Sequence, residues 1–384
     1  MLKIGVIGYG LRARDVLRAM SVFHIPFSVS AIADPRAGEI KRLEDPWLAD
    51  TRYYASDDEL LAQADVDGLL IATRCLMHAD MACKAAKRNL PLFLEKPVAI
   101  TLEQVAQLAR AFENYAPPVV VSFPLRLTPI VQKVKELIDQ DAIGAVDHAV
   151  VWNDVPYGRV YFNSWYRNYD QAGGLFLQKA THDLDCLGYL LGQDPAWVCA
   201  MKSQRIYGGD KPHDLRCRAC GEQRTCPESS FNRFYETFDF GEAPILEDDW
   251  CVFSREIRNE DSGNVLLEYA NGMQASYTQN FFARHKTARR GARLYGFKGS
   301  IEFDWYENRI HLYSHRQPTA TTIDFAGNMP HWGGDRELGY DFLLAMQEHR
   351  PSRSPLSAGI TSALTCLRAR ESAETRQFCR VALP

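Results

Sequence analysis

The sequence lacks a surplus of charge of either sign. Its 384 residues include 44 lysines and arginines against 48 aspartates and glutamates, which gives a net charge of -4, and no block of like charges occurs. A nucleic-acid-binding protein is expected to gather basic residues on one face or helix, so nucleic acid is excluded as a partner. No apolar run approaches the roughly 18 residues that span a bilayer, so we expect no membrane-spanning segment.

The N-terminus, MLKIGVI, also lacks the long apolar core and small-residue cleavage site of a signal peptide. We therefore expect a cytoplasmic protein. In that compartment its ten cysteines are expected to be thiols or metal ligands rather than disulfides. The hydrophobic share of 46% and the charged share of 24% are those of a globular protein, which excludes disorder, collagen and coiled coil.

The first third of the chain alternates short apolar runs with helical patterns, which predicts a parallel sheet covered by helices. The dipeptide Pro117-Pro118, followed by Pro124 and Pro129, is the best candidate for a domain junction. We therefore predict a first domain over residues 1–122. Its candidate strands are Leu2–Ile7, Val29–Ala33, Gly68–Ala72, Leu92–Leu94 and Val119–Val121.

The remaining residues, 123–384, predict a second domain with a mostly antiparallel sheet. Asn271-Gly272 lies between two apolar runs and is the strongest hairpin signal in the chain, and Lys298-Gly299 occupies a similar place. The predicted fold class is thus α/β plus α+β, with an open, mostly antiparallel sheet flanked by helices in the second domain. A cysteine-rich insertion lies near residues 205–235.

The turn Gly8-Tyr9-Gly10-Leu11-Arg12-Ala13 leaves a predicted strand and opens a predicted helix. The first glycine permits a tight turn, the second permits close approach of a pyrophosphate, and the helix N-terminus offers free N–H groups. Asp34 closes the second strand, where a carboxylate accepts hydrogen bonds from a ribose diol. We therefore predict NAD as cofactor. Arg36 keeps NADP open, because an arginine there can receive a 2′-phosphate.

Two further segments carry candidate chemistry. Glu95-Lys96-Pro97 places a lysine at the carboxyl end of a strand, where open α/β sheets bind ligands. After Gly173-Gly174, an expected helix carries Gln178, Lys179, His182 and Asp185, with three of these on one stripe. A histidine beside a lysine and a carboxylate can act as a general base, although from this segment alone a buried core histidine is favoured.

Together these motifs resemble the Gfo/Idh/MocA oxidoreductase family, as does the segment 65–73 with His78. The resemblance spans residues 1 to about 375. It implies a Rossmann domain followed by an open-sheet domain, oxidation of a secondary alcohol of a sugar, sugar acid or cyclitol with NAD(P), and a homodimer or homotetramer formed through the exposed sheet face. In members of the family, the lysine of Glu-Lys-Pro and the helix histidine contact the reacting hydroxyl.

The sequence departs from the family pattern at three places. Gln178 stands where members often carry an assisting aspartate, the loop after Thr73 lacks the usual proline, and the cysteine insertion is extra. We therefore expect Lys96, Lys179 and His182 to share the proton chemistry, with His182 accepting the proton and the Lys96 ammonium stabilising the alkoxide. The expected cofactor-binding residues are Gly8, Gly10, Leu11, Arg12, Asp34, Arg36, Thr73, His78, Glu95 and Lys96. The expected substrate-binding residues are Arg126, Tyr161, Trp165, Gln178 and Asp185.

The insertion holds Cys217, Cys220 and Cys226 within ten residues of low apolar content. Thiolates at this spacing suit tetrahedral zinc, with His213 or another residue as fourth ligand. Structural zinc stands at even odds with free thiols or a redox pair.

The leading hypothesis is an NAD(P)-dependent sugar or cyclitol oxidoreductase. One alternative is an NAD-dependent lyase or glycosidase that oxidises a sugar carbon transiently. A third is a nucleotide-binding sensor without catalysis, which Gln178 keeps open and which Lys96 and His182 argue against.

Overall fold

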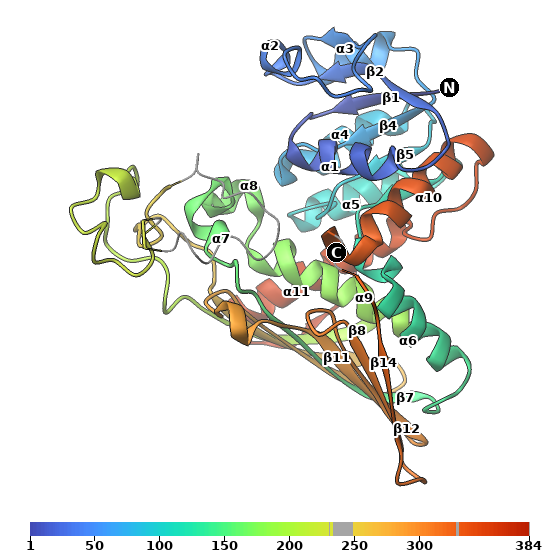
Figure 1. The fold of residues 1–384 in the computed structure, drawn as a ribbon, viewed down its shortest axis with the longest axis vertical. Coiled ribbons are helices and arrows are strands. Elements are labelled where there is room, and N and C mark those ends of the chain that lie inside the picture. The colour runs from blue at the N-terminus through green and yellow to red at the C-terminus, as the bar shows by residue number, and fades with distance from the viewer. Residues whose placement is uncertain (230, 233–248, 328–329, 384) are drawn as a thin grey trace.

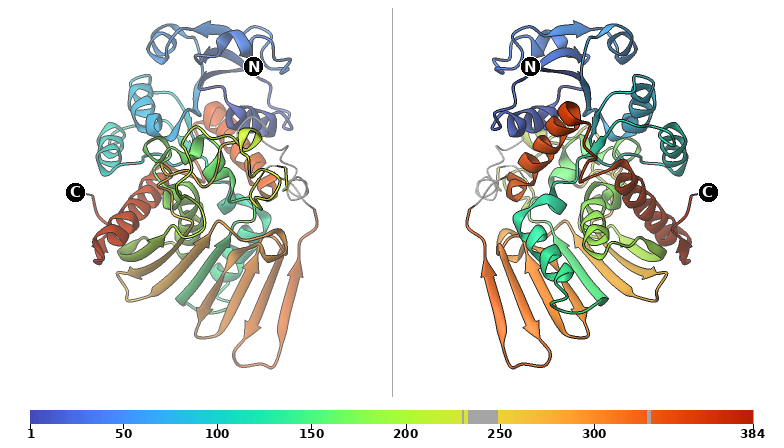
Figure 2. Two further views of the ribbon diagram at one scale, coloured as in Figure 1. Left: turned by 90° about the vertical axis from the view of Figure 1, so that its left-hand side faces the viewer. Right: turned by 90° about the vertical axis from the view of Figure 1, so that its right-hand side faces the viewer.

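The computed structural model describes residues 1–229, 231–232, 249–327 and 330–383 (Figure 1). Two sheets lie at opposite ends of the molecule, with helices between them (Figures 1 and 2). The first is a parallel sheet in the order β3-β2-β1-β4-β5-β6, and the second is a mostly antiparallel sheet in the order β14-β13-β12-β11-β7-β10-β9-β8-β15. The predicted fold class is confirmed.

The first sheet reverses its strand order between β1 and β4, which places a ligand-binding crevice at the carboxyl ends of these strands. Three of the five predicted strands have the predicted bounds. Another ends one residue earlier than predicted, at Ile71, and the second begins two residues earlier, at Phe27. The short β3 was missed. The strands are β1 (Leu2–Ile7), β2 (Phe27–Ala33), β3 (Arg52–Tyr54), β4 (Gly68–Ile71), β5 (Leu92–Leu94) and β6 (Val119–Val121). The helices are α1 (Leu11–Met20), α2 (Ala37–Ile40), α3 (Asp57–Gln63), α4 (Cys75–Ala86) and α5 (Leu102–Ala111).

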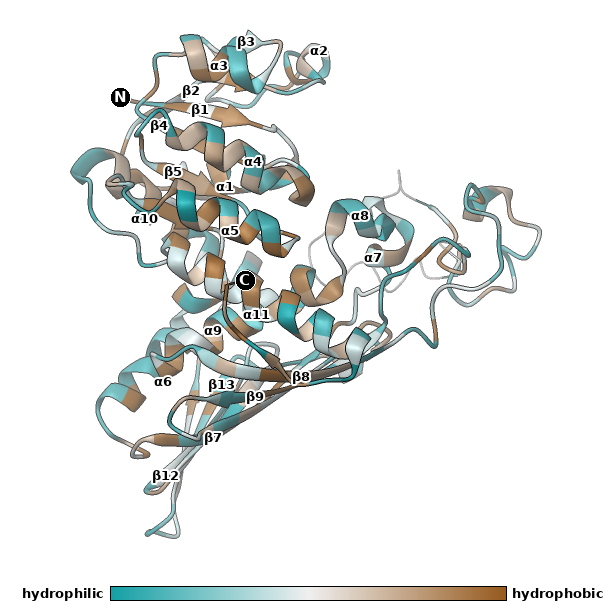
Figure 3. Ribbon diagram, turned by 180° about the vertical axis from the view of Figure 1, so that it is seen from behind, coloured by the Kyte–Doolittle hydropathy of each residue, from teal (hydrophilic) through white to brown (hydrophobic). Residues whose placement is uncertain are grey.

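The strands of this sheet are covered on both faces. All residues of β4 and β6 are buried, as expected for parallel strands that lie between two layers of helices. Helix α1 packs through Ala13, Val16, Leu17 and Met20, the spacing of one apolar helix face. Figure 3 shows the hydrophobic character of β1 in the middle of this domain.

The second sheet contains both predicted hairpins. β9 and β10 pair antiparallel around Asn271-Gly272, and β11 pairs antiparallel with β12. The second turn is formed by Phe297-Lys298, one residue earlier than predicted, because β12 begins at Gly299. The strands are β7 (Val146–Asp154), β8 (Pro195–Ser203), β9 (Ser262–Tyr269), β10 (Gln274–Asn280), β11 (Arg289–Gly296), β12 (Gly299–Asp304), β13 (Arg309–Ser314), β14 (Ala320–Asp324) and β15 (Cys379–Arg380).

Helices cover one face of this sheet, and the other face is exposed (Figure 2). The alternation of buried and exposed residues along β9 reflects this one-sided burial. None of the helices in the described part of the chain is long and apolar enough to cross a membrane. The α-helices of this half are α6 (Pro129–Asp139), α7 (Val160–Asn163), α8 (Tyr169–Ala172), α9 (Thr181–Leu191), α10 (Gly334–Glu348) and α11 (Leu356–Thr375).

Helix α10 crosses back onto the first domain. Its Leu338 and Phe342 are fully buried in the same cluster as Ile4 and Leu17. The approach to α1 is close, because a Cβ on Gly339 would lie 2.7 Å from the Met20 side chain. The predicted division after residue 122 therefore separates the two sheets, whereas the core of the first domain includes a helix from the C-terminal part of the chain.

Candidate active site

The glycine turn between β1 and α1 leaves room for a ligand. Gly8 has φ +83°, and a Cβ there would lie 2.8 Å from the Ala72 carbonyl oxygen, so a side chain is excluded. A Cβ on Gly10 would meet nothing within 4 Å, which shows open space beside the turn. Helix α1 begins at Leu11 without a side-chain cap, so its first N–H groups are available to a phosphate.

Asp34 follows β2 and is buried. Its carboxylate accepts hydrogen bonds from the backbone N–H groups of Tyr9 and Arg36, each at 2.8 Å, and the Arg36 guanidinium lies at 3.2 Å. Burial raises the pKa of Asp34, but the hydrogen bonds from Arg36 and Tyr9 outweigh it and lower the pKa below its usual value. The carboxylate is therefore ionised and suits a ribose diol. The turn and this carboxylate fit a dinucleotide.

His78 joins the two loops that border this crevice. Its Nδ1 lies 2.8 Å from the Pro97 carbonyl oxygen and its Nε2 lies 3.1 Å from the Thr73 carbonyl oxygen. The ring is buried, and burial lowers its pKa. Both ring nitrogens face protein carbonyls, so in this structure His78 positions the Thr73 loop.

Arg12, on the glycine turn, forms ion pairs with two carboxylates. Its guanidinium donates to Glu95 at 2.8 Å and to both carboxylate oxygens of Asp335 at 2.6 and 3.0 Å. Asp335 also lies 2.6 Å from the Nδ1 of His331. Burial raises the pKa of Asp335, but Arg12 and His331 outweigh it and hold the pKa far below its usual range. The Arg12 side chain thus connects the glycine turn, the Glu95 turn and α10.

Lys96 projects from the end of β5 towards the second domain. Its Nζ donates a hydrogen bond of 3.1 Å to the backbone carbonyl of Gln178. Burial lowers the pKa of Lys96 to about 8, and the nearby Lys179 acts in the same direction. No ion pair involves Lys96 within the described ranges. Lys96 can therefore gain and lose a proton near neutral pH.

A π-helical turn, Phe176–Ala180, precedes α9. It follows Gly173 and Gly174, whose φ values are +83° and +89°. A Cβ on Gly174 would lie 2.9 Å from the Tyr169 ring, so the turn requires glycine there. π-helical turns often occur at functional sites, and this one carries Gln178 and Lys179.

Lys179 and His182 lie beside Lys96. The Lys179 ammonium donates to the Tyr157 hydroxyl and lies 5.5 Å from the centre of the Tyr161 ring. Burial lowers the pKa of His182 well below its usual value, and the positive charges of Lys96 and Arg290 add to this effect. The imidazole is therefore neutral at physiological pH. Its Nδ1 is buried without a hydrogen-bond partner among the described residues.

Gln178 has a fixed side chain. Its Nε2 donates to the Ala172 carbonyl at 2.6 Å and to the Cys75 Sγ at 3.2 Å. Cys75 belongs to α4 of the first domain, so this contact crosses between the domains. Gln178 is one of the residues predicted to bind substrate, and these two contacts occupy its amide nitrogen.

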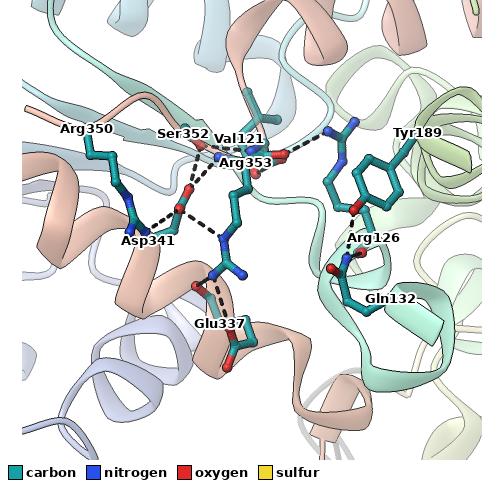
Figure 4. A network of polar contacts seen from close by, with 10 residues as sticks. Val121, Arg126, Gln132, Tyr189, Glu337, Asp341, Arg350, Ser352 and Arg353 are labelled. Atoms are coloured by element: carbon teal, nitrogen blue, oxygen red, sulfur yellow. Dashed lines mark hydrogen bonds and ion pairs between the residues drawn. The ribbon is translucent and has the colours of Figure 1, made fainter. Parts of the chain in front are cut away.

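Arg126 and Asp185, both predicted to bind substrate, pair with each other and line a different cavity from the one expected. The guanidinium donates to both carboxylate oxygens, at 2.5 and 3.0 Å, and also to the Arg353 carbonyl at 2.9 Å (Figure 4 shows the contact with Arg353). Burial raises the pKa of Asp185 to about 6, against the opposing effect of Arg126. Both residues line a cavity that contains none of Lys96, Lys179 and His182.

Trp165 forms part of an aromatic group near the mouth of the site. It stacks on Tyr166 with ring centres 4.0 Å apart, and the Arg74 guanidinium lies 4.0 Å from the centre of the Trp165 ring. Arg74 stands in the loop that follows Thr73. The contact links this loop of the first domain to the second domain.

The sequence interpretation missed the ion pair between Asp183 and Arg290. Arg290 Nε donates to Asp183 at 2.8 Å, and Asp183 also accepts hydrogen bonds from Asn153 at 2.7 Å and Tyr277 at 3.0 Å. All residues of this group are buried. An aspartate directly after His182, on a helix whose other side is apolar, is the signal that could have indicated it. Its partners on β7, β10 and β11 are distant in sequence.

The zinc site predicted at Cys217, Cys220 and Cys226 is not supported. All ten cysteines are free, and no group of three or more His, Cys, Asp or Glu side chains in the described ranges is arranged to hold a metal ion. Other contacts order this part of the insertion, because the Arg216 guanidinium lies 3.3 Å from the centre of the Trp250 ring. Residues 230 and 233–235 of the insertion lie outside the described residues.

Two family profiles match the chain. One, described as "Oxidoreductase family, NAD-binding Rossmann fold", matches residues 2–123, and the other, described as "GFO/IDH/MocA C-terminal domain", matches residues 131–302. Together they cover most of the sequence, including the first sheet and the strands β7 to β11 of the second sheet.

Individual relatives agree with these profiles. YteT of Bacillus subtilis (strain 168) is 28% identical over 346 residues, which cover 81% of this chain and 80% of YteT. The inositol 2-dehydrogenase of Rhizobium meliloti (strain 1021) is 25% identical over 201 residues, which cover 52% of this chain and only 58% of that protein. The structure of levoglucosan dehydrogenase in complex with NADH and levoglucosan aligns over 99% of both chains, with a TM-score of 0.78 and 20% identity, which shows a shared fold.

Proposed function

The chain belongs to the Gfo/Idh/MocA family of oxidoreductases, and on this premise we propose that it transfers a hydride between NAD(H) and a secondary alcohol of a sugar, sugar acid or cyclitol. One observation carries the proposal. Lys96 of the first domain contacts the Gln178 carbonyl of the second domain at 3.1 Å, beside His182. A substrate bound between the domains would meet both groups at the mouth of the dinucleotide crevice.

The proton of the reacting hydroxyl passes to Lys96 in this proposal. When bound, NAD⁺ accepts the hydride from the carbon that carries this hydroxyl. Lys96, with a pKa of about 8, supplies a neutral amine that can take the proton. The pKa of His182 lies well below its usual value, so its imidazole is a weaker base than the Lys96 amine. We therefore assign it the role of orienting the hydroxyl through a hydrogen bond, which revises the expectation from sequence.

The cofactor preference follows from Asp34. An ionised carboxylate accepts hydrogen bonds from a ribose diol and repels a 2′-phosphate, so NAD is preferred to NADP. Arg36, the group that would favour NADP, is held 3.2 Å from that carboxylate. Gly8, Gly10, Leu11 and the Thr73 loop would hold the rest of the dinucleotide.

A second candidate function, a lyase or glycosidase with a transient redox step, is favoured by one observation. A second imidazole, that of His331, lies near His182 and is paired with Asp335 at 2.6 Å. Removal of a proton next to a transient ketone requires such an extra base. This reaction would leave no net NADH and would exchange a substrate hydrogen with deuterated water.

We also propose a homodimer or homotetramer. The outer face of the second sheet exposes Trp197, Met201 and Leu266, which are 41%, 69% and 56% exposed on the adjacent strands β8 and β9. An apolar patch of this kind is typical of a protein interface. Light scattering at micromolar concentration tests it, and a monomer would contradict it.

The test of the function is a substrate panel. NAD-loaded protein is mixed with sugars, sugar acids and cyclitols, and NADH fluorescence is followed. We expect NADH to form with at least one compound, and this activity to disappear in Lys96→Met but persist in the control Lys41→Met, which changes an exposed lysine of the same domain. Deuterium exchange without NADH would support the lyase, and neither signal would reject both.

A further inference from the structure

A cavity of about 290 Å³ lies between α9 and α11, away from the candidate active site. Leu267 and Tyr269 of β9 line it, together with residues of α9 from Leu184 onwards and of the N-terminal half of α11. Its volume is close to the lower end of the range for small-molecule pockets. Lys96, Lys179 and His182 do not line this cavity, so it is separate from the proposed site of hydride transfer.

Tyr269 presents an unused hydrogen-bonding group. Its side chain is only 2% exposed, yet its hydroxyl makes no hydrogen bond among the described residues. Tyr269 lines the cavity, so its hydroxyl is available to donate or accept a hydrogen bond with a molecule bound there. Burial and the nearby charge of Asp194 raise the pKa of Tyr269, so the hydroxyl stays protonated.

Gly188 keeps the cavity open. It lies inside α9, where glycine is unfavourable for a helix. A Cβ there would meet only the Gln193 carbonyl oxygen, at 3.7 Å, so the protein itself does not require a glycine at this position. A side chain at 188 would instead occupy the cavity that Gly188 lines.

The remaining walls indicate the class of ligand. Hydroxyl groups of Ser357 and Thr361 line the cavity, and Thr361 donates to the Asp194 carboxylate at 3.4 Å. Arg126 and Asp185 neutralise each other, which leaves Asp194 as the excess charge and disfavours an anion. Tyr189, which accepts a hydrogen bond from Gln132 (Figure 4), adds an aromatic face.

We propose that this cavity binds a neutral polyhydroxy compound of monosaccharide size, as a second site distinct from the catalytic one. Aromatic faces, hydroxyl groups and one carboxylate are the groups that recognise vicinal diols on a ring with apolar faces. The proposal does not depend on which reaction the active site performs.

Occupation of the cavity would act on the helix that carries His182. Asp185 and Gly188 line the cavity within two turns of His182 on α9. On the opposite wall, Ser362 of α11 donates to the Thr181 carbonyl at 2.7 Å, next to His182. A ligand between α9 and α11 would therefore contact residues of both helices that lie next to the first turn of α9.

Calorimetric titration of the full-length protein with D-glucose, myo-inositol and glycerol tests the proposal. We expect at least one probe to bind, and binding to weaken roughly 3- to 10-fold in Tyr269→Phe through loss of one hydrogen bond. Gly188→Leu, which fills the cavity, should abolish this binding and keep the thermal midpoint. Tyr313→Phe on β13, outside the cavity, should leave it unchanged.

Two results would overturn the proposal. One is that no probe binds the wild-type protein. The other is that binding survives Tyr269→Phe and Gly188→Leu but is lost in His182→Ala, which would assign all polyol binding to the active site.

Discussion

Helix α9 and its neighbours contain two kinds of titratable group. At Lys96 and His182, burial and neighbouring positive charges lower the pKa of each base. In the ion pairs of Asp183 with Arg290 and Asp185 with Arg126, each carboxylate faces a guanidinium. Lys96 can therefore change protonation near neutral pH and His182 stays neutral, which suits both to chemistry, whereas the paired charges hold the helix in place.

The largest effect should follow from removing the base itself. Lys96→Met keeps much of the side-chain volume but leaves no group to accept the hydroxyl proton. We expect turnover to fall by about 10²- to 10⁴-fold, with NAD affinity within a few-fold of wild type. Steady-state kinetics and NAD titration measure both. Unchanged turnover would place Lys96 among the merely structural charges.

Breaking a paired charge should instead cost stability. Asp183→Asn leaves the Arg290 guanidinium buried without its carboxylate, and we expect the free energy of unfolding to fall by about 3–5 kcal/mol. Urea unfolding measures this change. The control is Asp147→Asn, at an exposed position of β7, which should have almost no effect. Equal stability of the two variants would contradict the structural role of the pair.

The pH dependence of turnover separates the two kinds of charge without mutation. Lys96 is protonated below about pH 8 and neutral above it, so alcohol oxidation should rise with pH through about 8 and then level off. Between pH 7 and 9 the neutral fraction of such a group grows about tenfold. Ketone reduction, which needs the ammonium, should fall over the same range. A flat profile for both directions would exclude Lys96 as the titrating base.

The smallest expected effect concerns the cofactor. Asp34→Ala removes the carboxylate that we assign to the ribose diol and frees Arg36. The preference for NAD over NADP should shrink by roughly tenfold, the value of a charge-assisted hydrogen bond. Calorimetric titration with both nucleotides measures it. Tighter binding of NADP to the wild-type protein would reverse the assignment.

Local sequence patterns were sufficient for the fold and for part of the site. The glycine turn, the strand before Asp34 and the hairpin at Asn271-Gly272 depend on neighbouring residues, and the structure contains them. The stripe drawn through Gln178, His182 and Asp185 assumed a regular helix. The π-helical turn Phe176–Ala180 precedes α9 instead, and Asp185 pairs with Arg126.

Other differences arise from partners that are distant in the chain. Arg12 belongs to the glycine turn, but its guanidinium binds Glu95 and Asp335, which lie 83 and 323 residues away. Asp183 is likewise held by Arg290, 107 residues away. The tertiary structure determines the partners of such side chains, because no local spacing in the sequence specifies which charge they meet.

The most direct test of the account is a crystal structure of the NADH-bound protein with a compound that the substrate panel identifies. The account predicts the reacting hydroxyl within about 3 Å of Lys96 Nζ and of the His182 imidazole. A hydroxyl that instead contacts Arg126 and Asp185, with Lys96 still bound to the Gln178 carbonyl, would contradict it.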